Sequence, residues 1–288
     1  MDDSGGFAPP PPPPPSAGGG GNIPQRGIGD ILSVAFEVYK ANAAKLIVIV
    51  AIVVVPLSFI SHFLTGVVFK PTVEKTGAIV VNGQTIVGGT TVTTRSFGTF
   101  IIGSLIAAAI AVIISAVLQA ALTRGAALAS VGDPVDTEAS YQYGFKKFGS
   151  VLLISILVGL VVGIGFILLI IPGIIFLTML AVAIPALIVE DQRGTAAMSR
   201  SWNLVKGHFW HVLGTIVVAA LITGIVGAIL GLLGGTNWFL QWIFGSIAQI
   251  ITAPFAALVT VLLYVDLRVR TEQLSGERLR ADLSSAAA

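Results

Sequence analysis

The sequence contains no cysteine. This absence excludes disulfide bonds, thiolate catalysis and cysteine metal ligands, and it removes the usual guide to the redox compartment. Charged residues are also scarce, at 10% of the 288 residues compared with about 25% in soluble domains. The formal net charge of +2 is too small to indicate nucleic acid as a partner. The first residues lack a basic segment followed by an apolar run, so we expect no cleavable signal peptide.

Apolar residues are what the sequence has in excess. They make up 55% of the chain, and the mean hydropathy is +0.94. Apolar runs recur at about the length that crosses roughly 30 Å of hydrocarbon as a helix. We therefore predict an all-α polytopic membrane protein with six transmembrane helices arranged in three hairpins. The predicted spans cover residues 45–69, 99–122, 150–171, 174–189, 211–233 and 241–265.

The two ends of the chain differ from this apolar part in composition. Residues 1–26 hold seven consecutive prolines and a run of glycines, which predict a disordered tail. A proline-rich ligand for a partner domain is the alternative interpretation. We divide the chain into this tail, a membrane domain over residues 27–270 and a second polar tail over residues 271–288.

Two turns are predicted within the membrane domain. In the outer loop, residues 70–98, Asn82-Gly83 lies between two β-prone runs, which is the pattern of a two-residue β-hairpin. Residues 150–189 are almost uncharged, and as one helix they would be about 60 Å long, twice the hydrocarbon thickness. They must fold back, and Pro172-Gly173 is the predicted turn.

Lysine and arginine are distributed unevenly between the two sides of this topology. The connections at 70–98, 172–173 and 234–240 contain three of these residues, whereas the opposite side contains thirteen. Cytoplasmic loops of membrane proteins carry the excess of lysine and arginine. We therefore predict a multi-pass protein of the cell (cytoplasmic) membrane with both termini in the cytoplasm.

A short pattern precedes the first span of each predicted hairpin. A serine is followed after three positions by an aromatic residue and after four more by a lysine. The copies are Ser33, Phe36 and Lys40; Ser140, Tyr143 and Lys147; and Ser199, Trp202 and Lys206. We predict that each copy forms a short amphipathic helix at the cytoplasmic membrane surface, called an elbow helix below.

The third elbow helix has the clearest apolar stripe. One face of this helix carries Met198, Trp202, Val205 and Phe209. Arg200 is expected on the opposite face, in water, and Gly207 is expected to let the chain turn into the fifth span. The stripe fits the headgroup layer of a membrane, with Lys206 reaching an anionic surface. The alternative is that the stripe packs against the protein's own bundle.

Residues 171–214 resemble a stretch of a bacterial and archaeal membrane family. The shared features are an Ile-Pro-Gly turn, the acidic residue Glu190, and a Ser-Trp…Lys-Gly…Phe-Trp segment at 201–210. That family includes the membrane domain fused to some glycerophosphodiester phosphodiesterases, and the chain resembles a stand-alone member. The resemblance implies a six-span α-helical fold. It does not imply phosphodiesterase activity, because a separate soluble domain carries the chemistry in the fused proteins.

Few residues are candidates for chemistry. The predicted spans hold no Asp, Glu, Lys or Arg away from their ends, so nothing marks a proton relay or an ion pathway. His62 follows Ser61, but adjacent residues on a helix point about 100° apart, and no orienting acid is near in sequence. His208 and His211, with the acidic pair at 190–191, form a nominal metal set without a recognised signature. We expect no catalytic residue, no cofactor and no metal.

Small residues recur at four-residue spacing in several spans. Such ladders allow helices to approach closely, within the bundle or between copies of the chain. The ladders are Gly103, Ala107 and Ala111; Gly159 and Gly163; and Gly227 and Gly231.

These features favour a non-enzymatic integral membrane protein that acts as a scaffold or accessory protein. Its expected partners are membrane lipids, including anionic headgroups, and a protein partner or a second copy, but no nucleic acid. A transporter or channel for an apolar or lipid-like solute is the alternative, because Pro56, Pro185 and Pro254 interrupt apolar runs. An intramembrane enzyme that uses the histidines is a third interpretation.

Overall fold

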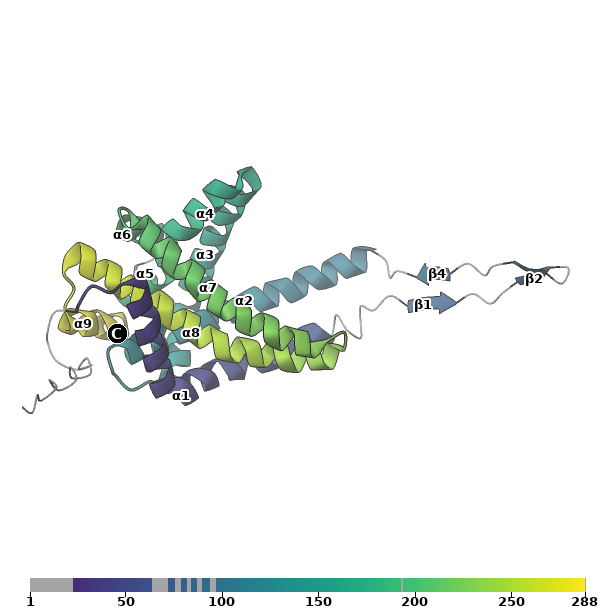
Figure 1. The fold of residues 1–288 in the computed structure, drawn as a ribbon, viewed down its shortest axis with the longest axis horizontal. Helices are drawn as coiled ribbons and strands as arrows, with labels where there is room; N and C mark the ends of the chain where they lie inside the picture. The colour runs from purple at the N-terminus through teal and green to yellow at the C-terminus, as the bar shows by residue number, and fades with distance from the viewer. Residues whose placement is uncertain are drawn as a thin grey trace, which may run out of the picture.

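The computed structural model describes residues 23–63, 97–192 and 194–287, and four short strands between residues 72 and 93. For the strands and for residues 97–111, 113, 114 and 287 it describes the backbone alone. The described part is predominantly helical (Figure 1). Its helices are α1 (Ile28–Phe63), α2 (Phe97–Ser130), α3 (Thr137–Leu168), α4 (Ile170–Met179), α5 (Ala183–Glu190), α6 (Thr195–Val205), α7 (Phe209–Gly234), α8 (Trp238–Glu272) and α9 (Gly276–Ala287).

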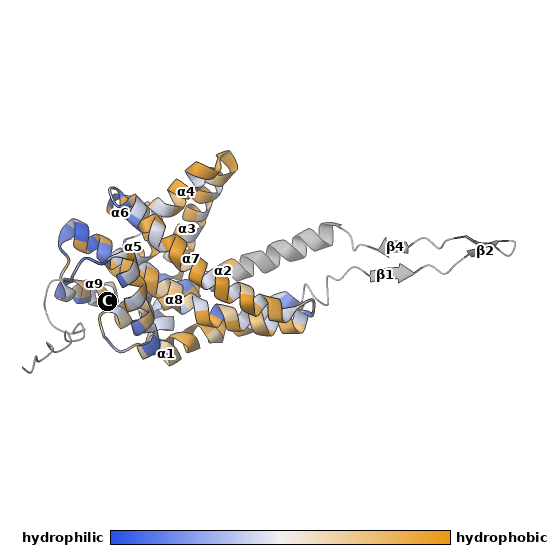
Figure 2. Ribbon diagram, viewed as in Figure 1, coloured by the Kyte–Doolittle hydropathy of each residue, from blue (hydrophilic) through white to orange (hydrophobic). Residues whose placement is uncertain are grey.

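Five segments of the described chain are long and apolar enough to cross a membrane. They are Ile28–Phe63, Thr137–Leu168, Ile170–Glu190, Phe209–Gly234 and Trp238–Glu272. The predicted span 99–122 falls on α2, and residues 64–69 of the first predicted span lie outside the described residues. Figure 2 shows the apolar character of α3, α4 and α7, and hydrophilic residues near α6, α9 and the start of α1. The prediction of a helical fold with several helices able to span a membrane is confirmed, whereas the number of six spans in three hairpins stays a prediction.

Helix α8 organises the bundle. Helices α1, α7 and α2 pack against it, and α3 packs on α2 and α4. Leu258 and Leu262, one turn apart on α8, are almost fully buried, as are Leu46 and Ile49 of α1. The i, i+4 spacing on α8 and the i, i+3 spacing on α1 each place apolar side chains on one face of the helix, and the two faces join in the same core.

The segment between α1 and α2 contains two antiparallel strand pairs. Strands β1 (Thr72–Lys75) and β4 (Thr90–Thr93) pair with each other, as do β2 (Ile79–Val81) and β3 (Gln84–Ile86). Ile79 lies opposite Ile86, and Val81 lies opposite Gln84. This register confirms the predicted hairpin, although its turn residues, 82–83, lie outside the described residues.

The turn predicted at Pro172-Gly173 is displaced by three residues. The chain reverses at Leu169, whose extended backbone (φ −163°, ψ 153°) separates α3 from α4. Pro172 lies in the first turn of α4, where its missing N–H costs nothing. Gly173 lies against Gly165, and a Cβ built on Gly173 would meet the Phe166 ring at 2.4 Å. The glycine therefore permits close packing of α3 on α4 rather than forming the turn.

The fourth predicted span, 174–189, is interrupted. Helix α4 ends at Met179 and α5 begins at Ala183, so the two short helices are offset by a turn. At this break the Met179 carbonyl accepts a hydrogen bond from the buried Ser201 hydroxyl of α6 at 2.8 Å. A backbone carbonyl left free by the break is thus satisfied away from lipid.

Only the third predicted elbow helix is a separate helix. The first two copies are the opening turns of α1 and α3 and continue into the spans without a break. In Figure 1 the first part of α1, in the darkest purple, runs at an angle to the rest. The lysines of these copies are followed by Ala41 and Phe148, which continue a helix. The third lysine is followed by Gly207, whose φ of +93° turns the chain into α7 as predicted.

The C-terminal region, predicted as a polar tail, folds as helix α9 on the bundle. Leu279 and Leu283 of α9 are buried, each about 2% exposed. The Arg280 side chain donates to the Val131 carbonyl at 2.7 Å, and this contact fixes α9 beside the end of α2. The leucine spacing was the sequence signal for this helix.

Candidate functional site

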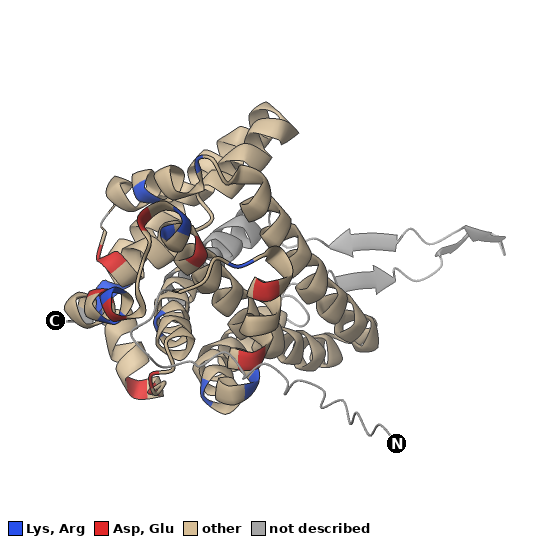
Figure 3. Ribbon diagram, turned by 60° about the vertical axis from the view of Figure 1, so that its left-hand side comes forward, with Lys and Arg blue, Asp and Glu red and all other residues tan. Residues whose placement is uncertain are grey.

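All charged side chains of the described helices lie toward one end of the bundle (Figure 3). No Asp, Glu, Lys or Arg occurs in residues 46–63, 148–189 or 207–265. We call the part of the bundle that carries these side chains the charged end. Three groups of these side chains join helices that are distant in the sequence.

The first group, the Glu190 cluster, joins four helices. Its members are Glu190 of α5, Arg200 of α6, Tyr264, Arg268 and Glu272 of α8, and Asp282 of α9. On α8, positions 264, 268 and 272 are four residues apart and therefore share one face. The C-terminus of α5 brings Glu190 to that face, and the bound helix α9 brings Asp282.

Two arginines and three carboxylates alternate in this cluster. Arg200 forms a two-point ion pair with Glu190, at 2.8 and 2.9 Å, and a third contact with Glu272 at 2.5 Å. Arg268 reaches Asp282 at 2.7 Å and Glu272 at 3.2 Å. The Tyr264 hydroxyl donates to Glu190 Oε1 at 2.5 Å. Each carboxylate therefore has at least one arginine partner.

Because the Glu190 cluster is buried, the pairing of its positive and negative charges matters for the stability of the fold. The Arg268 side chain is 3% exposed and that of Glu190 is 12% exposed. Removing one partner of a buried pair leaves a charge that neither water nor protein compensates. Burial alone would lower the pKa of Arg200, but its hydrogen bonds to Glu272 and Glu190 raise that pKa above the ordinary value. The cluster thus holds its arginines in the charged form.

The second group surrounds Asp266. This fully buried carboxylate accepts hydrogen bonds from Arg270 Nε at 2.6 Å and from the backbone N–H of Arg26 at 2.7 Å. His211 Nε2 of α7 lies 3.1 Å from Asp266 Oδ2, the oxygen to which Arg270 also donates. Arg270 also donates to the Arg26 carbonyl at 2.6 Å. Asp266 thereby attaches the segment before α1 to α7 and α8.

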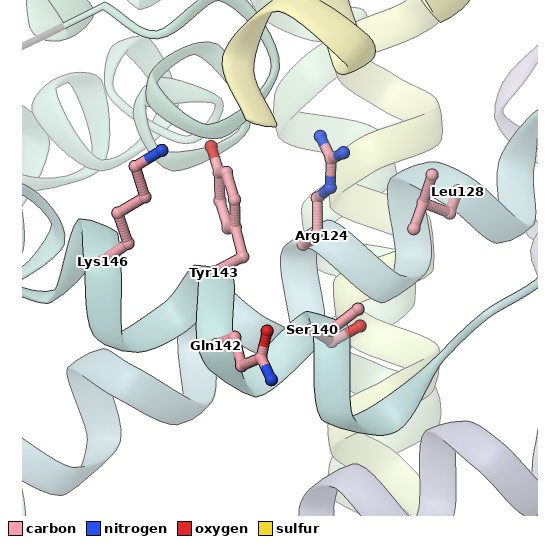
Figure 4. Close-up of a pocket in the computed structure, with 7 residues that line it drawn as sticks. Arg124, Leu128, Ser140, Gln142, Tyr143 and Lys146 are labelled. Atoms are coloured by element: carbon pink, nitrogen blue, oxygen red, sulfur yellow. The ribbon is translucent and has the colours of Figure 1, made fainter. Parts of the chain in front are cut away.

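The third group lies where α3 meets α2 and α5. Lys147 is buried and pairs with Asp191 at 2.5 Å. The Tyr143 hydroxyl donates to the Ile188 carbonyl at 2.9 Å, and the Arg124 guanidinium lies 4.9 Å from the Tyr143 ring centre. A cavity opens beside these residues, and Figure 4 shows its lining.

The three elbow copies have different environments. In the first copy Phe36 is 53% exposed and Lys40 lies over its ring at 4.9 Å. In the second copy Ser140, Tyr143 and Lys147 are all buried. In the third copy Ser199 and Lys206 are exposed. Equal spacing in the sequence therefore does not give equal positions in the structure.

The prediction that Arg200 of the third elbow helix faces water is wrong, whereas the contact of the apolar stripe with lipid headgroups stays a prediction. The buried residues of α6 are Ala197, Ser201, Leu204 and Val205. Of the predicted stripe only Val205 is fully buried, while Trp202 is 37% exposed beside Phe176. Arg200 is held in ion pairs instead of facing water. The physical reason is that small residues at 197 and 201 let α6 approach closely, while Glu190 requires a cationic partner.

The histidines are distributed over separate sites. His62 Nδ1 lies 2.8 Å from the Ser58 carbonyl on its own helix. His211 interacts with Asp266, and Glu190 interacts with arginines, so the nominal metal set at 190, 191, 208 and 211 is not assembled. Among the described residues, no group of three or more His, Asp or Glu is placed to hold a metal ion.

Within the described residues, the ladders at Gly159 and Gly163 and at Gly227 and Gly231 are not where helices meet. A Cβ built on Gly159, Gly163, Gly227 or Gly231 would meet nothing within 4 Å. Gly103, Ala107 and Ala111 lie on α2, where side chains are outside the described set. Close helix contact occurs instead at Gly144, where a Cβ would lie 2.9 Å from the Val117 carbonyl oxygen of α2.

Sequence reasoning missed the residues that hold the charged end together. Arg124, Arg268 and Asp282 had no recognised motif, and their partners lie far away in the chain. The available signal was the i, i+4 charge pattern on residues 266–272, which pairs position 266 with 270 and 268 with 272.

Comparisons with known proteins identify no relative. No protein-family model matches the chain, and neither a curated protein nor a solved structure matches it. The resemblance of residues 171–214 to the phosphodiesterase-associated membrane family stays a prediction.

Proposed function

We propose that the protein is a non-enzymatic scaffold or accessory protein of the cytoplasmic membrane, which acts through contacts of its charged end with lipids or a protein partner. The observation that supports this is the mutual pairing of the buried ionisable groups. Glu190, Arg200, Arg268 and Asp266 join helices to one another. Such pairing produces a fixed surface on the bundle.

The proposed orientation places this surface in the cytoplasm. The thirteen-to-three distribution of lysine and arginine supports that side for the charged end and both termini, and it supports six spans. The family resemblance also favours six spans.

Exposed aromatic side chains beside basic residues support a contact with lipid headgroups. Phe145, next to Lys146, is 69% exposed, and Trp210, close to Lys206, is 79% exposed. Aromatic residues with neighbouring lysines are typical of the membrane–water interface. These side chains are positioned to fix the depth of the charged end at the membrane surface.

A second candidate function is transport of an apolar or lipid-like solute. The break between α4 and α5 favours it, because interrupted spans are common in transporters. The Ser201 contact that closes this break supports a fixed bundle instead. Acceleration of lipid exchange in proteoliposomes by the purified protein would favour transport over the scaffold.

Replacing His62, His208 and His211 together by Gln should leave the function of the protein in its own cells nearly unchanged. Glutamine retains a hydrogen-bonding group for the contacts with the Ser58 carbonyl and with Asp266. The measurement is complementation of a deletion strain, with membrane levels matched by immunoblot. Loss of complementation at normal membrane levels would favour an enzyme or a metal site over the scaffold.

A further inference from the structure

A cavity of about 350 Å³ lies between the first part of α1 and the helices α7 and α8. We call it the α1 groove. Its apolar lining includes Leu32, Phe36 and Tyr39 of α1, Ile222 and Val226 of α7, and Phe255 of α8. This volume falls within the roughly 300–1,000 Å³ of small-molecule sites, which are mostly apolar. The groove is therefore large enough to hold a ligand.

The α1 groove offers few polar groups to water. Three of the four hydroxyl-bearing side chains in its lining donate to carbonyls of their own helices, at 2.8–3.1 Å. These three are Ser33, Thr223 and Thr252. Apolar cavities stay dry and accept apolar ligands, whereas a water molecule needs several polar partners. The interior of the groove thus matches a hydrocarbon ligand.

The α1 groove extends from the charged end toward the middle of the bundle. On α1 its lining reaches Tyr39, which directly precedes Lys40 of the charged end. On α7 its lining includes Ile222, which lies about 20 Å along the helix from Phe209. In a bilayer with about 30 Å of hydrocarbon, this position is at the depth of the acyl chains. One groove therefore connects the charged end with the acyl-chain region.

Lys40 supplies a positive charge at the edge of the α1 groove. Its ammonium lies 4.9 Å from the ring centre of Phe36, which lines the groove and is 53% exposed. Lys40 is itself exposed, and no carboxylate among the described residues forms an ion pair with it. A contact with an aromatic ring does not neutralise the ammonium, so its charge can attract an anion.

We propose that the α1 groove holds an acyl chain of an anionic membrane phospholipid, whose phosphate is bound by Lys40. This rests on the proposed function, in which the protein acts through lipid contacts, and it names the class of lipid. The apolar groove and the adjacent cation match the two parts of such a lipid in the correct order. The surrounding bilayer is as apolar as the groove, so burial of the acyl chain gives little preference. Selection therefore depends on the charge of Lys40 and on the fit of the acyl chain.

The test is native mass spectrometry of the purified full chain, freed of copurified lipid in a non-ionic detergent. The probes are dioleoyl phosphatidylglycerol, which is anionic, and dioleoyl phosphatidylcholine, which has the same acyl chains and no net charge. We expect one saturable site that binds the anionic lipid about fivefold more tightly, as expected for one lysine beside an anionic headgroup. Lys40→Gln should abolish this preference. Lys206→Gln should keep it, because Lys206 is an exposed lysine outside the lining of the groove.

Val226→Trp tests the groove itself. A tryptophan at this position fills space between α1 and α7, so the affinity for both lipids should fall by about tenfold or more. Val217→Trp is the matched control, because Val217 is 46% exposed on the same helix and nine positions away, on the opposite side. It should bind both lipids like the unchanged protein. Lys40→Gln changes only an exposed side chain, so it tests the proposal even if Val226→Trp does not fold.

Three results would overturn the proposal. They are the absence of saturable lipid binding, equal affinities for the two lipids, and an equal loss of affinity in Val226→Trp and Val217→Trp. The scaffold function is tested separately, by complementation with the histidine variant. A failure of lipid binding with intact complementation would therefore count against the α1 groove, and the reverse result would count against the scaffold.

Discussion

Arg268→Gln should lower the free energy of unfolding by about 3 kcal/mol, because it breaks a buried ionic cluster. Arg268 is the arginine partner of Asp282, and it shares Glu272 and Glu190 with Arg200. Without it, three carboxylates would face a single arginine in a region shielded from water. Asp282 would also lose its attachment to α8, so α9 should detach at lower denaturant concentrations.

The measurement is unfolding of the purified protein in detergent, followed by the fluorescence of its four tryptophans. Arg278→Gln is the matched control, because Arg278 is an exposed arginine of α9. An exposed arginine contributes little, so this control should shift stability by less than about 0.5 kcal/mol. Equal stability of the two variants would show that the Glu190 cluster does not stabilise the bundle.

Gly144→Leu should destabilise the protein by about 3 kcal/mol through overpacking between α2 and α3. Even a Cβ at Gly144 would lie 2.9 Å from the Val117 carbonyl oxygen and 3.3 Å from Ala121. The first of these atoms belongs to the backbone of a helix, which cannot move aside as a flexible side chain can. The two helices would have to separate, and the cavity between them that Arg124 and Tyr143 line would change shape.

Gly159→Leu is the control on the same helix. A Cβ at Gly159 would meet nothing within 4 Å in the described part of the chain, so leucine there has room. Its stability should stay within about 0.5 kcal/mol of the unchanged protein, or rise slightly because glycine is a poor helix former. If Gly159→Leu lowered the free energy of unfolding more than Gly144→Leu in the same assay, α2 and α3 would not meet at Gly144.

Local signals gave the parts of the fold that depend on neighbouring residues. The apolar runs predicted the long helices, Asn82-Gly83 predicted the pairing of β2 with β3, and Gly207 predicted the turn before α7. In each of these cases the physical cause, hydrophobic length or backbone freedom, is contained within a few residues.

The features that sequence reasoning missed depend on contacts between residues that are distant in the sequence. The orientation of α6 follows from the pairing of Arg200 with Glu190 and from the contact of Ser201 with the Met179 carbonyl. Amphipathic spacing identifies a stripe, but it does not distinguish a lipid-facing stripe from one beside a buried carboxylate. The use of Gly144 rather than Gly159 likewise depends on which helix lies opposite.

The most direct test of the account is the side of the membrane on which the charged end lies. Because the chain has no cysteine, single cysteines at exposed positions report location without background. Thr236→Cys, between α7 and α8, should react with a membrane-impermeant maleimide in intact cells. Thr195→Cys on α6 and Ser284→Cys on α9 should react only after lysis. Labelling of position 284 or 195 in intact cells, or protection of position 236, would contradict a charged end in the cytoplasm.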